Sequence, residues 1–394
     1  MKTVEEAIAY IHNRPKGGRK ESLYRMKALL AALDNPQNQL PKAIHITGTN
    51  GKGSVSTMVS NILRVAGYDT GLFVSPFITN FRERIQINNE LIPEADLVAT
   101  TKIVAKALVD VDKELFPDIP LEFEVLTAVM LTYFASKNLD AVVIEVGIGG
   151  LLDSTNVLSK TKVAVVTSVG LDHQKMLGNT ISEIAAQKSG IIHDESTVVI
   201  GDLPAEACKV IEEKASGVIK GKKNEFKSGL PGQYQIENTA TAVATVRAFD
   251  QQISNHCIQS GLNESIFAGR YELIQPNIML DGAHNAQGIR ALYQSLITSY
   301  PNKKISLIIG SLMDKNVSVE FDEILKNKWF NIVLVPFVGP NGRQGLSVEK
   351  TIAMYPQIST VSNWHQAVEK SRASLTVLTG SLYFVSEVRE YYAR

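Results

Sequence analysis

The sequence Gly-Thr-Asn-Gly-Lys-Gly-Ser at residues 48–54 lies between an apolar run at residues 43–47 and a helical pattern at residues 52–66. A strand, a glycine-rich loop and a helix in this order are the context of a phosphate-binding loop. Glycines let successive backbone N–H groups point at phosphate oxygens, and the helix N-terminus adds partial positive charge. Lys52 supplies a mobile cation. We therefore predict a nucleotide site made by Thr49, Asn50, Gly51, Lys52, Gly53 and Ser54.

The loop differs from the general pattern G-x-x-x-x-G-K-[ST]. Its first glycine is two residues closer to the lysine, and Gly53 separates Lys52 from Ser54. The alternative interpretation is a glycine-rich turn with an ordinary surface lysine. Because strand, loop, lysine, hydroxyl and helix all agree, we favour the phosphate site.

Apolar strand-like runs alternate with helical patterns on both sides of the loop. Continuous β-branched runs between helices favour a parallel sheet that is covered on both faces. The expected strands are residues 43–47, 68–74, 140–146, 162–169, 278–280, 305–309, 332–336 and 375–378. The expected helices are residues 52–66, 95–111, 124–136, 236–249, 286–298 and 382–392, and residues 212–232 are left without assigned structure.

The fold class that follows is α/β. We expect a P-loop-type, parallel-sheet ATP-binding domain at residues 1–272 and a smaller Rossmann-like α/β domain at residues 273–394. A chain of 394 residues that is 44 % hydrophobic suits two domains.

The charge balance excludes some partners. There are 40 Lys and Arg residues against 40 Asp and Glu residues, so no strong net field attracts nucleic acid or an acidic membrane. No apolar run is long enough to span a bilayer. Cys208 and Cys257 lie far apart, which favours a reducing, cytoplasmic compartment over a disulfide framework or a thiolate zinc site.

The variant loop resembles that of the folylpolyglutamate synthase and dihydrofolate synthase family within the Mur ligase superfamily. A dozen further blocks follow the family pattern in order, between about residues 35 and 385. They include Ser75-Pro76-Phe77, Asn80–Arg84, Phe123-Glu124, Glu145–Gly150, Asp153–Asn156, Leu171–His173, Gln187–Ile192, Tyr234-Gln235, Gly269-Arg270, Asp281–Asn285, Asp314-Lys315 and Gly380–Tyr383. One departure is residues 201–232, a region that is shorter than the family pattern.

The resemblance implies that Ser75, Glu145 and His173 bind Mg²⁺. Each stands at an expected strand end, where ligands bind in open α/β sheets. Mg²⁺ prefers oxygen donors and is usually bound by protein side chains together with the phosphates of a nucleotide substrate. Glu145 could instead form a buried ion pair, and His173 could be a capping or core histidine.

Lys188 lies near the glycine-marked end of an expected helix, and by itself would be a solvated lysine. In the family the matching lysine is carbamylated, and the resulting anion supports the metal site. We therefore predict a catalytic role for Lys188, together with Lys52.

Other matches imply further contacts. Asn238, Arg270 and Asp281 match nucleotide contacts, and His284 matches a catalytic histidine that helps to hold glutamate or the developing charge. Lys315 and Ser381 are candidates for the amino acid, and Arg82 for a carboxylate, although Glu83 and Arg84 also suggest a solvated salt-bridge cluster. The pterin-bearing substrate is expected near Phe123, Glu124, Leu152, Asp153 and Ser154, with a core position as the alternative for Phe123.

The implied function is an ATP-dependent ligase that adds L-glutamate to a folate through an acyl phosphate, with ATP as substrate and Mg²⁺ as cofactor. We expect a monomer that binds these small molecules. Dihydrofolate synthase, which joins glutamate to dihydropteroate, remains an alternative, alone or as a second activity. A P-loop nucleotide switch without ligase activity would leave Asp281 and His284 without a task. A cell-wall peptide ligase would carry an extra N-terminal domain, and only about 40 residues precede the loop.

Overall fold

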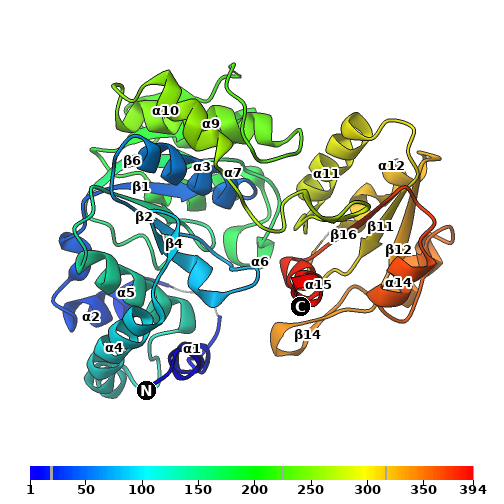
Figure 1. The fold of residues 1–394 in the computed structure, drawn as a ribbon. Helices are drawn as coiled ribbons and strands as arrows, with labels where there is room; N and C mark the ends of the chain where they lie inside the picture. The colour runs from blue at the N-terminus through cyan, green and yellow to red at the C-terminus, as the bar shows by residue number, and fades with distance from the viewer. Residues whose placement is uncertain (18–20, 224, 316, 394) are drawn as a thin grey trace. The chain divides into compact units, whose positions relative to one another are not determined.

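The computed structural model describes residues 1–17, 21–223, 225–315 and 317–393. These residues form two compact units, each built on its own sheet (Figure 1). The first unit contains Met1–Ser228 and Glu237–Ser265, and the second contains Gly229–Ile236 and Ile266–Arg394. The division differs from the expected boundary after residue 272. Residues 229–236 and 266–272 join the second unit because Tyr234 and Tyr271 bond to Asp281.

The first unit has an eight-stranded sheet in the order β4-β3-β2-β5-β1-β6-β7-β8. Its strands are β1 (Lys42–Thr47), β2 (Thr70–Phe73), β3 (Ile85–Ile87), β4 (Glu90–Leu91), β5 (Ala141–Glu145), β6 (Thr161–Val166), β7 (Thr197–Ile200) and β8 (Val218–Lys220). The six strands from β2 to β8 in this order are parallel. The continuous apolar runs predicted β2, β5, β1 and β6, whereas β7 was not predicted and β8 lies in residues 212–232, which were left without assigned structure. β3 and β4 are antiparallel additions at one edge and were not predicted.

Helices cover both faces of this sheet. The cluster formed by α1 (Val4–His12), α2 (Tyr24–Ala31), α4 (Glu94–Leu115) and α5 (Glu122–Ala135) packs on Val142 and Ile144 of β5. In Figure 1 these helices lie below the sheet, whereas α3 (Lys52–Val65), α9 (Gln235–Phe249) and α10 (Asn255–Asn263) lie above it. The alternation of side chains along each strand places apolar groups on both faces, which explains why the strands read as unbroken apolar runs.

Further helices follow the strands on the other side of β1. α7 (Ile181–Lys188) and α8 (Ala205–Glu212) pack on β6 and β7, and the short α6 (Gln174–Leu177) precedes them. Thr180 begins α7 with a capping box, because its hydroxyl accepts the N–H of Glu183 and the Glu183 carboxylate accepts its N–H.

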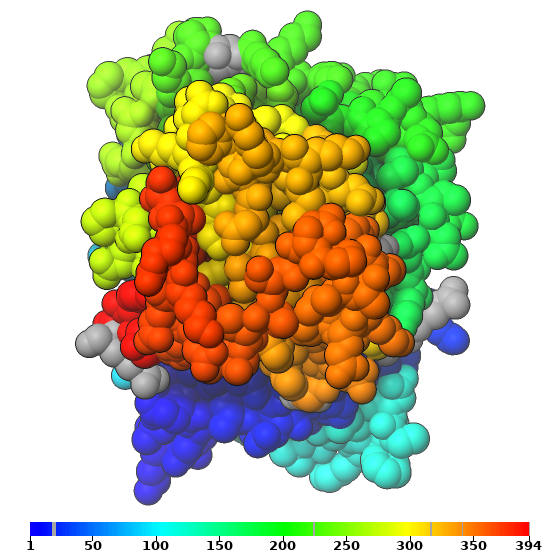
Figure 2. Space-filling view, turned by 90° about the vertical axis from the view of Figure 1, so that its right-hand side faces the viewer, coloured from blue at the N-terminus to red at the C-terminus, as the bar shows by residue number. Residues whose placement is uncertain are grey.

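The second unit has a six-stranded sheet in the order β15-β12-β11-β16-β10-β9. Its strands are β9 (Glu272–Gln275), β10 (Ile278–Leu280), β11 (Ile305–Ile309), β12 (Phe330–Leu334), β15 (Ser359–Thr360) and β16 (Leu375–Thr379), and only β9 runs antiparallel. α11 (Ala286–Ser299) and α12 (Phe321–Leu325) cover one face, and α14 (Trp364–Lys370) and α15 (Leu382–Ala393) cover the other. α13 (Val348–Met354) and the β13–β14 ribbon (Val338–Gly339, Arg343–Gln344) complete the unit, whose surface Figure 2 shows in yellow, orange and red.

The described helices include none that is both long enough and apolar enough to cross a membrane.

Candidate active site

The phosphate loop turns sharply at Gly51, which has a φ of 84°. This left-handed conformation favours glycine. A Cβ atom at Gly51 would also lie 2.4 Å from Oδ1 of Asn238. The structure therefore brings Asn238, a predicted nucleotide contact, directly against the loop.

Residues after β6 support the loop from the other side. The Asn50 N–H donates to Oγ of Ser168 at 2.8 Å, and Oγ1 of Thr167 donates to the Asn50 carbonyl at 2.6 Å. Thr49 exchanges hydrogen bonds with the backbone of Gly170 at 3.0 and 3.1 Å. The loop is thus held in a curled form by contacts that the local sequence does not reveal.

Lys52 begins α3, as expected of the lysine in a phosphate loop. Its Nζ donates to the carbonyls of Gly48 at 3.0 Å and Thr49 at 3.4 Å. The ammonium group therefore lies over the loop, next to the N-terminus of a 14-residue helix that favours anions. Gly53 and Ser54 are buried in the first turn of that helix.

Two of the three predicted metal ligands lie together. Glu145 is the last residue of β5 and is 3 % exposed, and its carboxylate accepts the backbone N–H of Ser75 at 3.1 Å. Glu145 also pairs in register with Ile46 of β1, two residues before the phosphate loop begins. A carboxylate and a hydroxyl residue therefore lie at the same sheet edge as the loop.

His173 lies farther along the chain after β6, with a φ of 51°, and its side chain is 34 % exposed. It precedes α6, but its side chain makes no capping bond, so it does not act as a cap. Its backbone N–H donates to Oδ1 of Asp172 at 2.8 Å. No cage of three or more His, Cys, Asp or Glu side chains is found in the described part of the chain.

Lys188 is buried, with 2 % of its surface exposed, so the interpretation as a solvated helical lysine was wrong. Burial and then the nearby charge of Lys52 lower its pKa to about 7, and the charges of Asp172 and Asp153 oppose this effect. Lys188, Lys52, Asp153 and Asp172 thus form one electrostatic cluster. The sequence suggested no such burial, because the surrounding helix has polar residues on both sides of Lys188.

The predicted pterin residues lie around residues 147–156. Phe123 is half-buried, and a Cβ at Gly147 would lie 2.7 Å from its ring. Oδ2 of Asp153 accepts the Ile148 N–H at 2.9 Å, and Oδ1 accepts both the N–H and the hydroxyl of Thr155. Leu152 is half-buried and Ser154 fully buried, so Asp153 and Ser154 shape this loop from within.

Glu124 is fully buried, and its carboxylate accepts hydrogen bonds from Nε and Nη2 of Arg25 at 3.0 and 3.3 Å. It also accepts the Leu121 N–H at the start of α5. These bonds give Glu124 a structural role at the start of α5, and its contact with a substrate stays a prediction. Arg82 donates to the Ile92 carbonyl and pairs with Glu94 at 3.3 Å, whereas the Glu83 carboxylate accepts the backbone N–H groups of Ile78 and Asn80. Arg82 therefore forms a salt bridge with a residue other than the expected Glu83, and its role as a carboxylate ligand stays a prediction.

The second unit contains a buried network around Asp281, which is 2 % exposed. Its carboxylate accepts the Tyr234 hydroxyl at 2.8 Å and the backbone N–H groups of Tyr271 and Ala283, each at 2.9 Å. Burial raises the pKa of Asp281, although the charge of Arg270 opposes this. Arg270 itself is half-buried beside Gly282 and lies over the ring of Phe267, with its Cζ 5.4 Å from the centroid.

The other predicted residues of this unit lie near strand ends. His284 lies 2.9 Å through Nδ1 from the Gly282 carbonyl, and because a carbonyl only accepts, Nδ1 carries the proton. Ser381 is buried at the start of α15, directly after Gly380 with its φ of 105°. Lys315 is 8 % exposed, and its neighbour Asp314 pairs with Arg343 at 2.8 Å.

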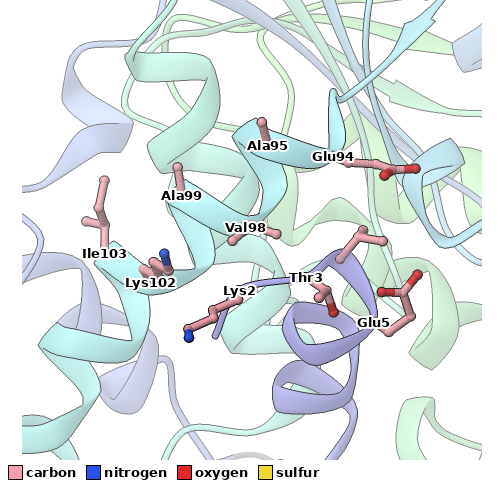
Figure 3. Close-up of a pocket in the computed structure, with 10 residues that line it drawn as sticks. Lys2, Thr3, Glu5, Glu94, Ala95, Val98, Ala99, Lys102 and Ile103 are labelled. Atoms are coloured by element: carbon pink, nitrogen blue, oxygen red, sulfur yellow. The ribbon is translucent and has the colours of Figure 1, made fainter.

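A separate surface groove of about 760 Å³ lies between the start of α1 and the start of α4 (Figure 3). None of the predicted site residues lines it. Its lining consists of Lys2, Thr3, Val4, Glu5, Glu94, Ala95, Val98, Ala99, Lys102 and Ile103.

The sequence analysis assigned no role to Arg25, His45, Thr155 or Tyr234, although Thr155 and Tyr234 lie in blocks that follow the family pattern. His45 is a polar residue within an apolar strand, and this signal could have been noticed. The partners of Arg25 and Tyr234 are 99 and 47 residues away, and no local pattern indicates them.

The chain is similar to a known protein family and to several named proteins. The family described as Mur ligase, glutamate ligase domain, matches residues 269–382. The folylpolyglutamate synthase of Lacticaseibacillus casei is 35 % identical, and the match covers 98 % of this chain and 97 % of that protein. The dihydrofolate synthase/folylpolyglutamate synthase of Bacillus subtilis is 32 % identical, with 98 % of each chain covered.

Solved structures agree with these relatives. An FPGS–AMPPCP–folate complex is 34 % identical with a TM-score of 0.85, covering 98 % of this chain and 99 % of the other. Mycobacterium tuberculosis folylpolyglutamate synthase complexed with ADP and AMPPCP is 27 % identical with a TM-score of 0.87, covering 99 % and 98 %. Together with the phosphate loop and the carboxylate beside it, these full-length similarities show that the chain belongs to the folylpolyglutamate synthase and dihydrofolate synthase family of ATP-dependent Mur ligases.

Proposed function

We propose that this chain joins L-glutamate to a folate and releases ADP and phosphate. The observation that carries the proposal is the position of Glu145, paired with the Ser75 N–H and in register with Ile46 just before the phosphate loop. A nucleotide on this loop would place its terminal phosphate near that carboxylate. The Lacticaseibacillus and Bacillus relatives, which carry the names of folate ligases, support the substrate class.

The proposed reaction has two steps. A substrate carboxylate attacks the γ-phosphorus of ATP and forms an acyl phosphate and ADP. The amine of L-glutamate then attacks the carbonyl carbon, and phosphate leaves. Phosphoryl transfer needs alignment and charge neutralisation more than a protein nucleophile, and the backbone N–H groups of the loop and the Lys52 ammonium supply both.

The residues at the sheet edge fit Mg²⁺. A buried carboxylate is costly unless it meets a cation, and Mg²⁺ is bound by one or two carboxylates together with substrate phosphates. Glu145, Ser75 and His173 would hold the ion, and the ion would supply positive charge to neutralise the transferring phosphate.

We also propose that Lys188 is carbamylated. Only a neutral amine reacts with carbon dioxide, and a pKa of about 7 leaves a large neutral fraction near neutrality. A native mass heavier by one carbon dioxide, and lost in Lys188→Ala, would support this. A free ε-ammonium in a well-ordered crystal structure would contradict it.

Each predicted domain has a task in this proposal. Residues 1–272 would bind ATP, and residues 273–394, which overlap the matched glutamate ligase domain, would bind glutamate through His284, Lys315 and Ser381. Arg270, Asp281 and Asn238 would contact the nucleotide. Arg82 would be a further carboxylate ligand, and the folate or pteroate would bind near Phe123, Glu124, Leu152, Asp153 and Ser154. We expect a cytoplasmic monomer.

A second activity is favoured by a specific observation. The Bacillus and Escherichia coli relatives carry both synthase names, and a solved Escherichia coli relative contains DHPP and ADP. We therefore include dihydropteroate as an alternative acid.

The deciding experiment measures ADP release with glutamate, Mg²⁺ and either a reduced folate or dihydropteroate. Turnover that requires both acid and amine supports the ligase, and the faster acid identifies the activity. ATP hydrolysis at the same rate with and without the acid and the amine would indicate a nucleotide switch instead. Lys52→Ala should abolish turnover while its circular dichroism spectrum stays that of the wild type.

A further inference from the structure

A buried histidine lies in the strand that leads into the phosphate loop. His45 is 0 % exposed, and in register it lies between Ile144 of β5 and Ala164 of β6. Its Nε2 lies 2.8 Å from Oγ1 of Thr155. A polar ring among apolar neighbours costs free energy unless it is hydrogen-bonded, so this contact accounts for the ring's place in the core.

The direction of each hydrogen bond follows from the groups involved. Oγ1 of Thr155 lies 2.6 Å from Oδ1 of Asp153, and that oxygen also accepts the Thr155 N–H at 3.0 Å. A carboxylate accepts, and a hydroxyl has one hydrogen to give. Thr155 therefore donates to Asp153 and accepts from His45, whose Nε2 must carry the proton. Nδ1 of His45 has no hydrogen-bond partner among the described residues.

These bonds connect β1 to the loop at residues 147–156. Asp153 closes this loop by accepting the Ile148 N–H at 2.9 Å through its other oxygen. Thr47 attaches the same loop to the same strand, because its hydroxyl donates to the Gly149 carbonyl at 2.5 Å. β1 thus carries the phosphate loop at its end and holds a second loop through side chains 45 and 47.

We infer that His45 is a positioning residue, which acts through Thr155 and Asp153 to hold residues 147–156 in place for the acid substrate. The inference rests on the proposed function, in which that acid binds near Leu152 and Asp153. A histidine that only fills space would be replaceable by any side chain of similar volume. A positioning histidine needs a donor at the place of Nε2.

Two matched substitutions separate these roles. His45→Met keeps the approximate volume and removes the donor, whereas the amide nitrogen of His45→Gln reaches the place of Nε2. We expect His45→Met to raise the KM for the acid about tenfold, equivalent to about 1.4 kcal/mol. The KM for ATP should stay within about twofold, since the phosphate loop is held by Thr167 and Ser168 instead. His45→Gln should restore most of the lost affinity for the acid.

A second pair keeps the test decisive if His45→Met does not fold. Thr155→Val removes the hydroxyl and Thr155→Ser keeps it, so only the first should raise the KM for the acid. The double variant His45→Met/Thr155→Val should be no worse than the poorer single variant, because both remove the same connection. Three results would overturn the inference. His45→Met and His45→Gln could raise the KM for the acid equally, or the KM values for the acid and for ATP could rise in parallel. The double variant could also lose affinity for the acid by the sum of the two single losses.

The tautomer gives a readout that needs no activity. In protein labelled with ¹⁵N-histidine, the His45 signals, identified by their loss in His45→Gln, should show a proton on Nε2 and none on Nδ1. A proton on Nδ1 would overturn the inference. Should the wild type turn over neither acid, the proposed function fails, while the tautomer and the unfolding free energies of the same variants still decide whether the connection exists.

Discussion

Replacement of Lys188 by methionine should stabilise the first unit while abolishing ligase activity. The side chain is 2 % exposed, and its pKa falls from 10.5 to about 7 because of burial and the charge of Lys52. The difference of 3.5 between these two values corresponds to about 5 kcal/mol, the free-energy cost of holding a charged lysine in this place. Methionine has a similar volume and no charge, so the variant avoids that cost.

The sign of the pH dependence follows from proton binding. Between pH 7 and 10.5 the unfolded chain holds a proton on Lys188 that the folded chain releases. Raising the pH through this window therefore stabilises the folded wild type. The advantage of Lys188→Met should shrink from about 4 kcal/mol at pH 7 to about 2 kcal/mol at pH 9.

The measurement is urea-induced unfolding of both proteins at the two pH values, in buffers freed of carbon dioxide so that no carbamate forms. Lys188→Met should release no ADP at either pH. A variant that is less stable than the wild type at neutral pH, or whose advantage does not change with pH, would refute the reasoning. Either result would mean that the buried lysine is stabilised by its carboxylate neighbours Asp172 and Asp153.

Three further predictions concern other parts of the first unit. Gly51→Ala should raise the KM for ATP at least about tenfold, because the Gly51 backbone has a φ of 84° and a Cβ there would lie 2.4 Å from Asn238. The control is Gly67→Ala, at a position with a φ of 92° and open space around it. This control should leave the KM for ATP unchanged. Arg25→Met should lower the unfolding free energy by about 3–5 kcal/mol, since it leaves Glu124 buried without this cation. Arg82→Met breaks a pair with the solvent-exposed Glu94 and should cost only about 1 kcal/mol. Equal losses in the two denaturation curves would contradict this. Burial lowers the pKa of His45 from 6.5 to about 3. As the pH falls, the unfolded chain therefore binds a proton at His45 before the folded chain does. As the pH falls below about 6.5, the wild type should lose up to about 1.4 kcal/mol per pH unit relative to His45→Gln, and parallel stability–pH curves would exclude this origin.

The parallel sheets were predictable because their signal is local. β10 and β11 lie at the expected residues, and β1 and α3 differ from expectation by one residue at one end. A strand buried on both faces must be apolar at every position, and a helix must begin where the glycine loop ends. Several strands of two to four residues were missed, among them the antiparallel edges and the parallel β7 and β8, since so short a pattern cannot be distinguished from a loop.

The phosphate loop was recognisable for the same reason, because its seven residues carry the glycines, the lysine and the hydroxyl that it needs. The proposed metal site at the ends of β5 and β2 was harder to predict. Glu145 and Ser75 are 70 residues apart, and their contact depends on the pairing of β2 with β5. The family pattern indicated them, whereas spacing along the chain could not.

The sequence by itself determined the two α/β sheets and the phosphate loop, because periodicity, glycines and helix starts act over a few neighbouring residues. Only the tertiary structure decided that Lys188 is buried where the charge of Lys52 acts on it. It also decided that Glu124 forms an ion pair with Arg25 and that the Tyr234 hydroxyl donates to Asp281. Burial and electrostatics depend on which distant segments are packed together. The pKa and the partner of a buried side chain are therefore determined only when the sheet order brings those segments into contact.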